Sequence, residues 1–185
     1  MLATASHLLL LAGCVDRSLD DPLIRAARTG DVAQIRRLLA AGADPERPAG
    51  VNHWNALMHA IHKNRIGAVE ALLDGGAKPN SRSGHLTPLV MAAGYGQAGI
   101  VRLLLKKGAD PRFTTTNGTT ALEAAVSGTP DIDRFTVGDC QTATVQALVE
   151  AAPDLKLRDN FKGNLARRVA KFGGCTEVLR LLDRR

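Results

Sequence analysis

The residues of this chain whose types and spacing best suit chemistry are its histidines. His53, His59 and His62 lie close in sequence, and the last two, three residues apart, can share one side of a helix. A metal site is one interpretation of this group, and ordinary solvated histidines are the other. The three cysteines do not form a zinc pattern. The sequence contains no glycine-rich phosphate loop, nucleophile elbow or HExxH motif. We therefore expect no catalytic site, no metal and no cofactor.

The composition indicates a soluble helical domain with a basic surface. Hydrophobic residues make up 45% of the chain but aromatic residues only 3%, so the core must consist of Leu, Ile, Val and Ala. Small aliphatic cores suit helices that pack closely. The formal net charge of +6 favours an acidic partner or an anionic membrane surface, although it is also compatible with a simple solvated surface. No Lys/Arg cluster is interleaved with stacking aromatics, so we expect no binding of nucleic acid.

Internal repetition organises the rest of the sequence. Equivalent positions fall at Pro22, Ala56, Pro88 and Ala121, at intervals close to 33 residues. A degenerate fifth copy places Leu165 at the same position. The last interval exceeds the period by about 11 residues because the segment 129–139 interrupts the fourth copy.

The residue types at fixed places in each copy predict two helices. Thr87 and Thr120 can cap the N-terminus of a first helix, and prolines at positions 22 and 88 suit its first turn. A second helix follows with an apolar stripe. Gly42, Gly76 and Gly108 come where a helix ends in the left-handed conformation.

This pattern resembles the ankyrin repeat. The third copy matches it best, with Thr87-Pro88-Leu89, Ala92-Ala93, Gly96, Leu103-Leu104 and Gly108-Ala109-Asp110 in order. The resemblance covers residues 21–185. It implies an all-α solenoid of about five helix–turn–helix repeats with an insertion in the fourth repeat, because no repeat can bury its apolar face alone. It also implies a non-catalytic domain that binds another protein and is monomeric when free.

In ankyrin proteins, partners usually contact the loop tips and the exposed end of the first helix of each repeat. The alignment places His53 near a loop tip and His62 on the open helix surface. We favour Trp54 and Tyr95 as partner anchors over core positions, because exposed aromatics are typical of interfaces. Phe161 and Phe172 either contact the partner or cap the end of the core. The residues expected to bind the partner are Trp54, His62, Lys63, Leu86, Tyr95, Phe161, Lys171 and Phe172.

The N-terminal segment has the features of a targeting sequence. The apolar run Leu8 to Ala12 is too short to span a bilayer, and Leu11-Ala12-Gly13-Cys14 resembles the lipobox of bacterial lipoproteins. The resemblance implies a signal peptide over 1–13, a lipid on Cys14 and a short linker to residue 20. The segment departs from the pattern because it carries only His7 in place of Lys or Arg. The alternative is a frayed apolar helix with an incidental cysteine.

The two remaining cysteines, Cys140 and Cys175, are candidates for a disulfide. The repeat alignment places both at the start of the second helix, in the fourth and fifth repeats. Neighbouring helices lie about 10 Å apart, slightly too far for a bridge, but the insertion before Cys140 can let that turn lean toward its neighbour. The alternative is a pair of buried thiols.

These features lead to one main interpretation of function and two alternatives. The main one is a membrane-anchored protein-binding module on the periplasmic side of a bacterial membrane, inner or outer. Lipoproteins with ankyrin repeats resemble, among others, immunity proteins that neutralise a secreted effector such as a phospholipase. The alternatives are a periplasmic scaffold or stress-related ankyrin protein, and a cytosolic ankyrin adaptor.

Overall fold

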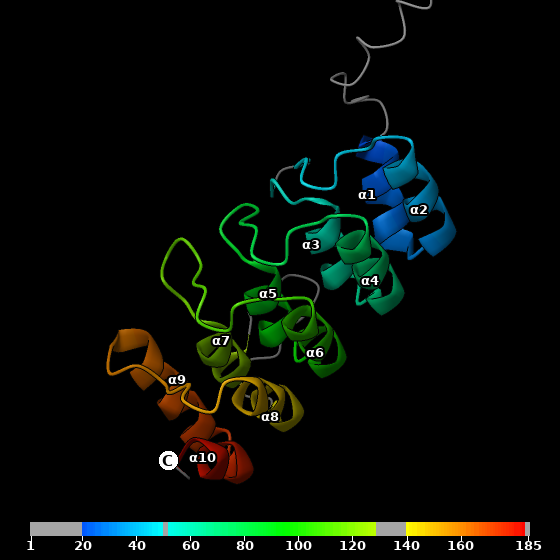
Figure 1. Cartoon of the computed structure of the whole chain (residues 1–185). Coiled ribbons are helices and arrows are strands. Elements are labelled where there is room, and N and C mark those ends of the chain that lie inside the picture. Colours follow the sequence, from blue (N-terminus) through cyan, green and yellow to red (C-terminus); the bar gives the residue numbers. More distant parts are fainter. Residues whose placement is uncertain (1–19, 50–51, 129–139, 184–185) are drawn as a thin grey trace, which may run out of the picture.

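The computed structural model describes residues 20–49, 52–128 and 140–183. The secondary structure of these residues is helical apart from isolated bridges that join Ala49 to Trp54 and Ser83 to Leu86. Ten helices form five consecutive pairs (Figure 1). They are α1 (Asp20–Thr29), α2 (Val32–Ala40), α3 (Ala56–His62), α4 (Ile66–Asp74), α5 (Pro88–Gly94), α6 (Ala98–Lys106), α7 (Ala121–Ser127), α8 (Thr142–Ala151), α9 (Phe161–Phe172) and α10 (Thr176–Asp183).

The pairs stack into a solenoid with two rows of helices. The first helices of the repeats pack against one another in one row, and the second helices form the other row (Figure 1). The loops that join the repeats project beside the first-helix row. This architecture confirms the predicted all-α solenoid of five repeats. It also confirms the interruption of the fourth repeat, because fourteen residues, 128–141, separate α7 from α8, whereas two or three residues separate the helices of the other pairs.

Local sequence signals set the helix ends. The Thr87 side chain accepts a hydrogen bond from the amide of Val90, and Thr120 forms a reciprocal capping box with Glu123. The predicted left-handed glycines are also present, with φ of 95° at Gly42 and 100° at Gly76. A Cβ is disfavoured in this conformation, which explains why glycine recurs after the second helices.

The core runs between the two rows and is almost entirely aliphatic. Leu57 and Ile61 of α3 are completely buried between the neighbouring repeats. Alanines such as Ala60 and Ala92 are buried where first helices meet, so their small side chains allow close packing of the helices. Each repeat therefore owes its buried surface to the repeats on either side of it.

The last repeat differs from the alignment at its first helix. The alignment of Leu165 with Pro22 implies a loop at Phe161 and a loop tip at residue 163, but α9 begins at Phe161, and Gly163 is buried in its first turn. Asn160 caps the helix by accepting from the amide of Gly163 at 2.9 Å. A Cβ at position 163 would lie 2.0 Å from the carbonyl oxygen of Arg158, so only glycine fits against that backbone.

Adjacent repeats are also joined by side chains that precede the second helices. The Arg65 side chain donates to the carbonyl of Arg28, and Gln97 and Gln141 donate to the carbonyls of Ile61 and Gly94. In each case a residue at the start of a second helix reaches back to the first helix of the preceding repeat. These hydrogen bonds and the apolar packing together fix the distance between stacked repeats.

A buried ion pair joins the fourth repeat to the loop entering the fifth. Glu123 is 2% exposed, and its carboxylate accepts hydrogen bonds from the Arg158 guanidinium at 2.7 and 2.9 Å and from the amide of Thr120 at 3.0 Å. Burial raises the pKa of Glu123, but these hydrogen bonds outweigh burial and hold the pKa below the ordinary glutamate range. The carboxylate is therefore ionised in the folded protein at neutral pH.

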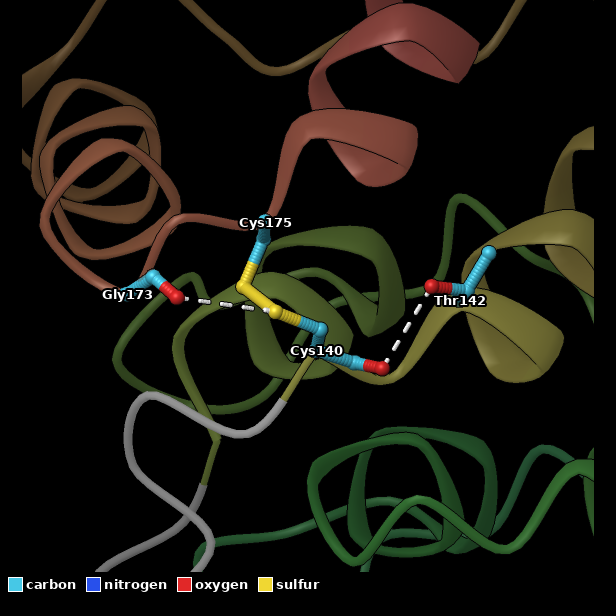
Figure 2. Close-up of a disulfide and its surroundings, with 4 residues drawn as sticks. All are labelled: Cys140, Thr142, Gly173 and Cys175. Atoms are coloured by element: carbon cyan, nitrogen blue, oxygen red, sulfur yellow. Dashed lines mark hydrogen bonds between the residues drawn. A yellow bond between two sulfur atoms is a disulfide. The ribbon is translucent and has the colours of Figure 1, made fainter.

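The fourth and fifth repeats are further joined by a disulfide between Cys140 and Cys175 (Figure 2). Cys140 lies two residues before α8 and Cys175 directly before α10, and their Cα atoms are 5.2 Å apart. Because both residues lie outside the helices, the separation of the helix axes does not limit the bridge. Thr142 anchors the Cys140 end, since its amide donates to the Cys140 carbonyl at 2.8 Å.

The ion pair gives a prediction for stability and pH. We expect Glu123→Gln to lower the free energy of unfolding at pH 7 by about 2 kcal/mol, a modest value for a buried pair because Arg158 stays partly in water. A lowered pKa stabilises the fold above the ordinary glutamate range and loses this effect as pH falls through the folded pKa. The difference between wild type and variant in urea titrations should therefore shrink as the pH falls below the ordinary glutamate range. A constant difference across this range would contradict the role of the charge.

The disulfide gives a second prediction. The bridge spans a sequence separation of 35 residues, and the chain-entropy model assigns such a loop roughly 4 kcal/mol. We expect a reductant to lower the urea midpoint of the wild type but not that of a Cys140→Ser/Cys175→Ala double variant, which serves as the matched control. Alkylation of the native protein without reductant, followed by mass spectrometry, checks the bond directly. Two alkylated thiols at these positions would refute it.

Candidate functional site

Two of the predicted contact residues lie below the surface. Tyr95 is 7% exposed and His62 is 8% exposed, so the prediction that both face a partner is wrong. Tyr95 directly follows α5, and its hydroxyl group lies 3.1 Å from Nδ1 of His62 in the preceding repeat. The long phenol side chain extends across the repeat boundary and packs there against the ring of His62. These two residues join the second and third repeats and do not form a contact surface.

Trp54 completes this aromatic group at its outer side. Its ring packs against His59 and His62, with centroid distances of 5.6 and 5.2 Å, and it is half-buried. The His62 ring in turn lies 5.8 Å from that of Tyr95. One part of the Trp54 ring is therefore supported from below while another part stays accessible, an arrangement that suits an interface anchor.

Trp54 and Leu86 line the same cleft between the tips of two successive loops. Ser83 holds these loops together, because its hydroxyl donates to the carbonyl of His53 and accepts from the amide of Asn55, both at 2.7 Å. The cleft has a volume of about 600 Å³. It is lined by Asn52, His53, Trp54, Gly84, His85 and Leu86. The structure thus brings together two of the residues that we predicted to contact the partner.

Lys63 lies at a second cleft, between the first two repeats. This cleft measures about 490 Å³, and basic side chains provide most of its lining. Its lining residues are Ile24, Arg25, Arg28, Thr29, Lys63 and Arg65. Arg25 and Arg65 were not predicted as site residues. The pair Arg28/Thr29 occupies the position in the first repeat that His62/Lys63 occupies in the second. This equivalence was the sequence signal that contact residues extend into the first repeat.

The remaining predicted contact residues lie on α9, at the far end of the stack. Phe161 is 81% exposed and Phe172 is 90% exposed, so the alternative that they cap the core is wrong. Lys171 is also exposed. The two phenylalanines are eleven positions apart, about three helical turns, so they lie on one face of the helix. The buried Gly163, Ala166 and Ala170 lie on the opposite face. The structure leaves these side chains in solvent, as contact residues require.

The histidines do not come together with other ligands. His53 is exposed at a loop tip with φ of 51°, whereas His59 is half-buried on α3. Burial, followed by the positive charges of Arg28, His62 and Lys63, lowers the pKa of His59 to about 4. Among the described residues, no group of three His, Cys, Asp or Glu side chains is arranged to hold a metal ion. Cys14 and the lipobox lie outside the described residues.

Two properties of the described chain bear on the class of protein. None of its helices combines the length and the apolar character that a membrane crossing requires. The five stacked helix pairs, with clefts along the first-helix row and the loop tips, define a helical-repeat solenoid built to present a surface.

Comparison with known families identifies the repeat. A family model described as ankyrin repeats in three copies matches residues 2–83, and a second, described as ankyrin repeats in many copies, matches residues 72–125. The two models together match residues 2–125, so the chain is built from ankyrin repeats. The match over residues 2–83 also extends across the segment that we predicted to be a signal peptide.

Curated relatives share only the repeat region. The chain is 34% identical over 119 residues to the palmitoyltransferase AKR1 of Kluyveromyces lactis, which covers 57% of this chain and 15% of that protein. It is 35% identical over 74 residues to the 2-5A-dependent ribonuclease of Mus musculus, covering 40% and 10%. It is 32% identical over 129 residues to the zygote-specific protein 3 of Chlamydomonas reinhardtii, covering 68% and 34%. The chain thus spans a minor part of each relative.

Proposed function

We propose that this protein binds another protein from a lipid anchor on the periplasmic side of a bacterial membrane. The observation that carries the binding role is the cleft lined by Trp54 and Leu86, where two expected contact residues meet at the loop tips. The aromatic support beneath Trp54 gives this surface a fixed shape before a partner arrives, which reduces the entropy lost on binding. Ankyrin repeats in general act as modules for protein–protein interaction.

Two separate features support the proposed location. Residues 11–14 resemble a lipobox, which would make Cys14 the lipidated N-terminus of the processed protein. The bridge between Cys140 and Cys175 belongs to the class of structural disulfides that persist in oxidising compartments such as the periplasm. The two features involve different cysteines and different chemistry, so each supports the location without the other.

Within this proposal, neutralisation of a secreted effector is the role we favour. A rigid binding surface held near a bilayer suits the blocking of an enzyme that attacks lipids, such as a phospholipase. A periplasmic scaffold with a partner from the same cell is the alternative role in the same compartment. The relatives that are transferases or nucleases do not extend their activities to this chain, because the similarity covers only a small part of each.

A cytosolic adaptor is the second candidate function, and one observation favours it. The family match that begins at residue 2 treats the apolar N-terminal segment as part of the repeat array. In that case residues 11–14 would not be a processing signal, and Cys14 would be an incidental cysteine. Whether Cys14 carries a lipid therefore distinguishes the two candidate functions.

We expect Cys14 to carry the lipid. Wild-type protein produced in a bacterial host should incorporate labelled palmitate, fractionate with membranes and accumulate as a precursor in the presence of globomycin. Cys14→Ser should remove the label and release the protein from the membrane. Cys140→Ser is the matched control and should remain labelled. Soluble wild-type protein that retains Met1 would overturn the proposed anchor and favour the cytosolic adaptor.

We expect Trp54 to contribute directly to partner affinity. Capture of the partner from the native host, followed by titration of the isolated complex, should show that Trp54→Ala weakens binding by about 2 kcal/mol or more, as truncation of a central anchor does. Ile66→Ala is the control, because Ile66 is an exposed apolar residue on α4, in the other helix row. Both variants are compared at a temperature where each is folded. Equal affinity of the two variants would exclude Trp54 from the interface.

A further inference from the structure

We propose that the cleft between the first two repeats binds a carboxylate-rich segment of a protein partner. We call it the basic cleft and define it by Arg25, Arg28, Lys63 and Arg65, with Ile24 and Thr29 completing its lining. The proposal rests on the protein-binding function and adds the chemistry of the partner. It concerns a different surface from the cleft lined by Trp54 and Leu86.

The basic cleft collects positive charge from two repeats. Arg25 and Arg28 are one turn apart on α1, and Lys63 and Arg65 belong to the turn between α3 and α4. All four line one open hollow, and among the side chains that the structure describes no carboxylate lines it. The three arginines have no acidic neighbour among the described lining residues, so they create a local positive potential, which attracts and orients an anionic group.

Four arginines elsewhere in the described chain have acidic partners that the arginines of the basic cleft lack. Arg112, Arg158, Arg167 and Arg180 each form an ion pair with a carboxylate. Arg25, Arg28 and Arg65 form none with any carboxylate whose side chain the structure describes. The charges of these three arginines are therefore not neutralised within the described part of the molecule.

One of these arginines is already held in place. Nε of Arg65 donates to the carbonyl of Arg28 at 3.3 Å, and the aliphatic part of its side chain lies against Gly30, where φ is 86°. A Cβ at position 30 would lie 3.1 Å from Cδ of Arg65, so glycine leaves room for the arginine. The outer nitrogens of the guanidinium remain available to a ligand, and less conformational entropy is lost when they bind.

His59 responds to the same positive charge. The low pKa of this residue arises first from burial and then from the positive charges of Arg28, His62 and Lys63. His59 is therefore neutral at physiological pH and does not add to the charge of the basic cleft. Its imidazole ring nonetheless reports the local potential. A bound anion near Arg28 and Lys63 would favour the protonated ring and raise its pKa.

The surroundings of the basic cleft favour a protein segment over a phosphate or a bilayer. Trp54 packs on His59, and the charges of Arg28 and Lys63 act on the same histidine, so an apolar contact surface lies near the cationic one. A peptide that alternates acidic and apolar residues can occupy both surfaces, whereas inorganic phosphate can use only the cations. A bilayer is flat, and these cations line a hollow between repeats. Guanidinium groups pair with carboxylates and with phosphates alike through two parallel hydrogen bonds, so the neighbouring apolar surface, and not this pairing, favours the peptide.

The test uses the full chain and a fluorescent oligoglutamate peptide of about eight residues, measured by fluorescence anisotropy at low salt. We expect Arg25→Gln/Arg28→Gln to weaken binding about tenfold, because two charge-assisted contacts are lost. Arg36→Gln/Arg37→Gln is the matched control, since both arginines are exposed on α2 of the same repeat and the change in net charge is identical. We expect the control to stay within about twofold of the wild type. Equal weakening in both variants would overturn the proposal.

The second measurement is the pKa of His59, followed by NMR with and without the peptide. The proposal requires the peptide to raise this pKa from about 4, and an unchanged value in the saturated complex would place the peptide elsewhere. Millimolar phosphate that displaces the peptide completely would overturn the proposal in favour of a phosphate site. Vesicles with about 30% phosphatidylglycerol provide the membrane comparison. If they bind through Arg25 and Arg28 and the peptide does not bind, the basic cleft is a membrane site and the proposal is overturned. Each of these results leaves partner capture through Trp54 intact, so failure of this proposal is distinguishable from failure of the protein-binding function.

Discussion

The structure depends on the burial of each inner first helix between the first helices of its two neighbours. α3 shows this most clearly, because Leu57 and Ile61 are completely covered only when the repeats on both sides are in place. Alanines at the crossing points keep the helices close, and residues such as Gln97 add hydrogen bonds across the same boundaries. Stability is therefore shared between neighbours, and no single repeat has a core of its own.

This mode of stacking also determines where a partner can be recognised. The residues that hold the repeats together lie between the rows or at the repeat boundaries, which leaves the loop tips and the ends of the first helices free to vary. The aromatic group that ends in Trp54 shows how the two functions combine. Its inner members, His62 and Tyr95, stabilise a boundary, and the same contacts fix the orientation of the outer ring. The surface around Trp54 is rigid because the side chains beneath it are packed between the second and third repeats.

Sequence periodicity was sufficient to predict the five repeats, the caps at Thr87 and Thr120 and the left-handed glycines, because each depends on local chemistry at a fixed position. Periodicity gave wrong predictions where a side chain or a helix extends beyond the bounds of its own repeat. Position in the repeat suggested that Tyr95 is exposed, but the phenol is long enough to reach His62 in the preceding repeat. The early start of α9 depends on the contact between Gly163 and the backbone of Arg158, which periodicity does not encode. The basic cleft was missed because Arg25 and Arg65 meet only when two repeats are stacked.

The bridge between Cys140 and Cys175 changes how the chain responds to proteases. The segment it encloses contains the connection between α8 and α9, which crosses the surface with Pro153 and Asp154 exposed. A backbone cut in that connection produces two polypeptides, yet the covalent link between their sulfur atoms keeps both in the same molecule. The fragments remain at high effective concentration and can keep their native packing. A nicked molecule therefore keeps its terminal repeat, which would otherwise diffuse away.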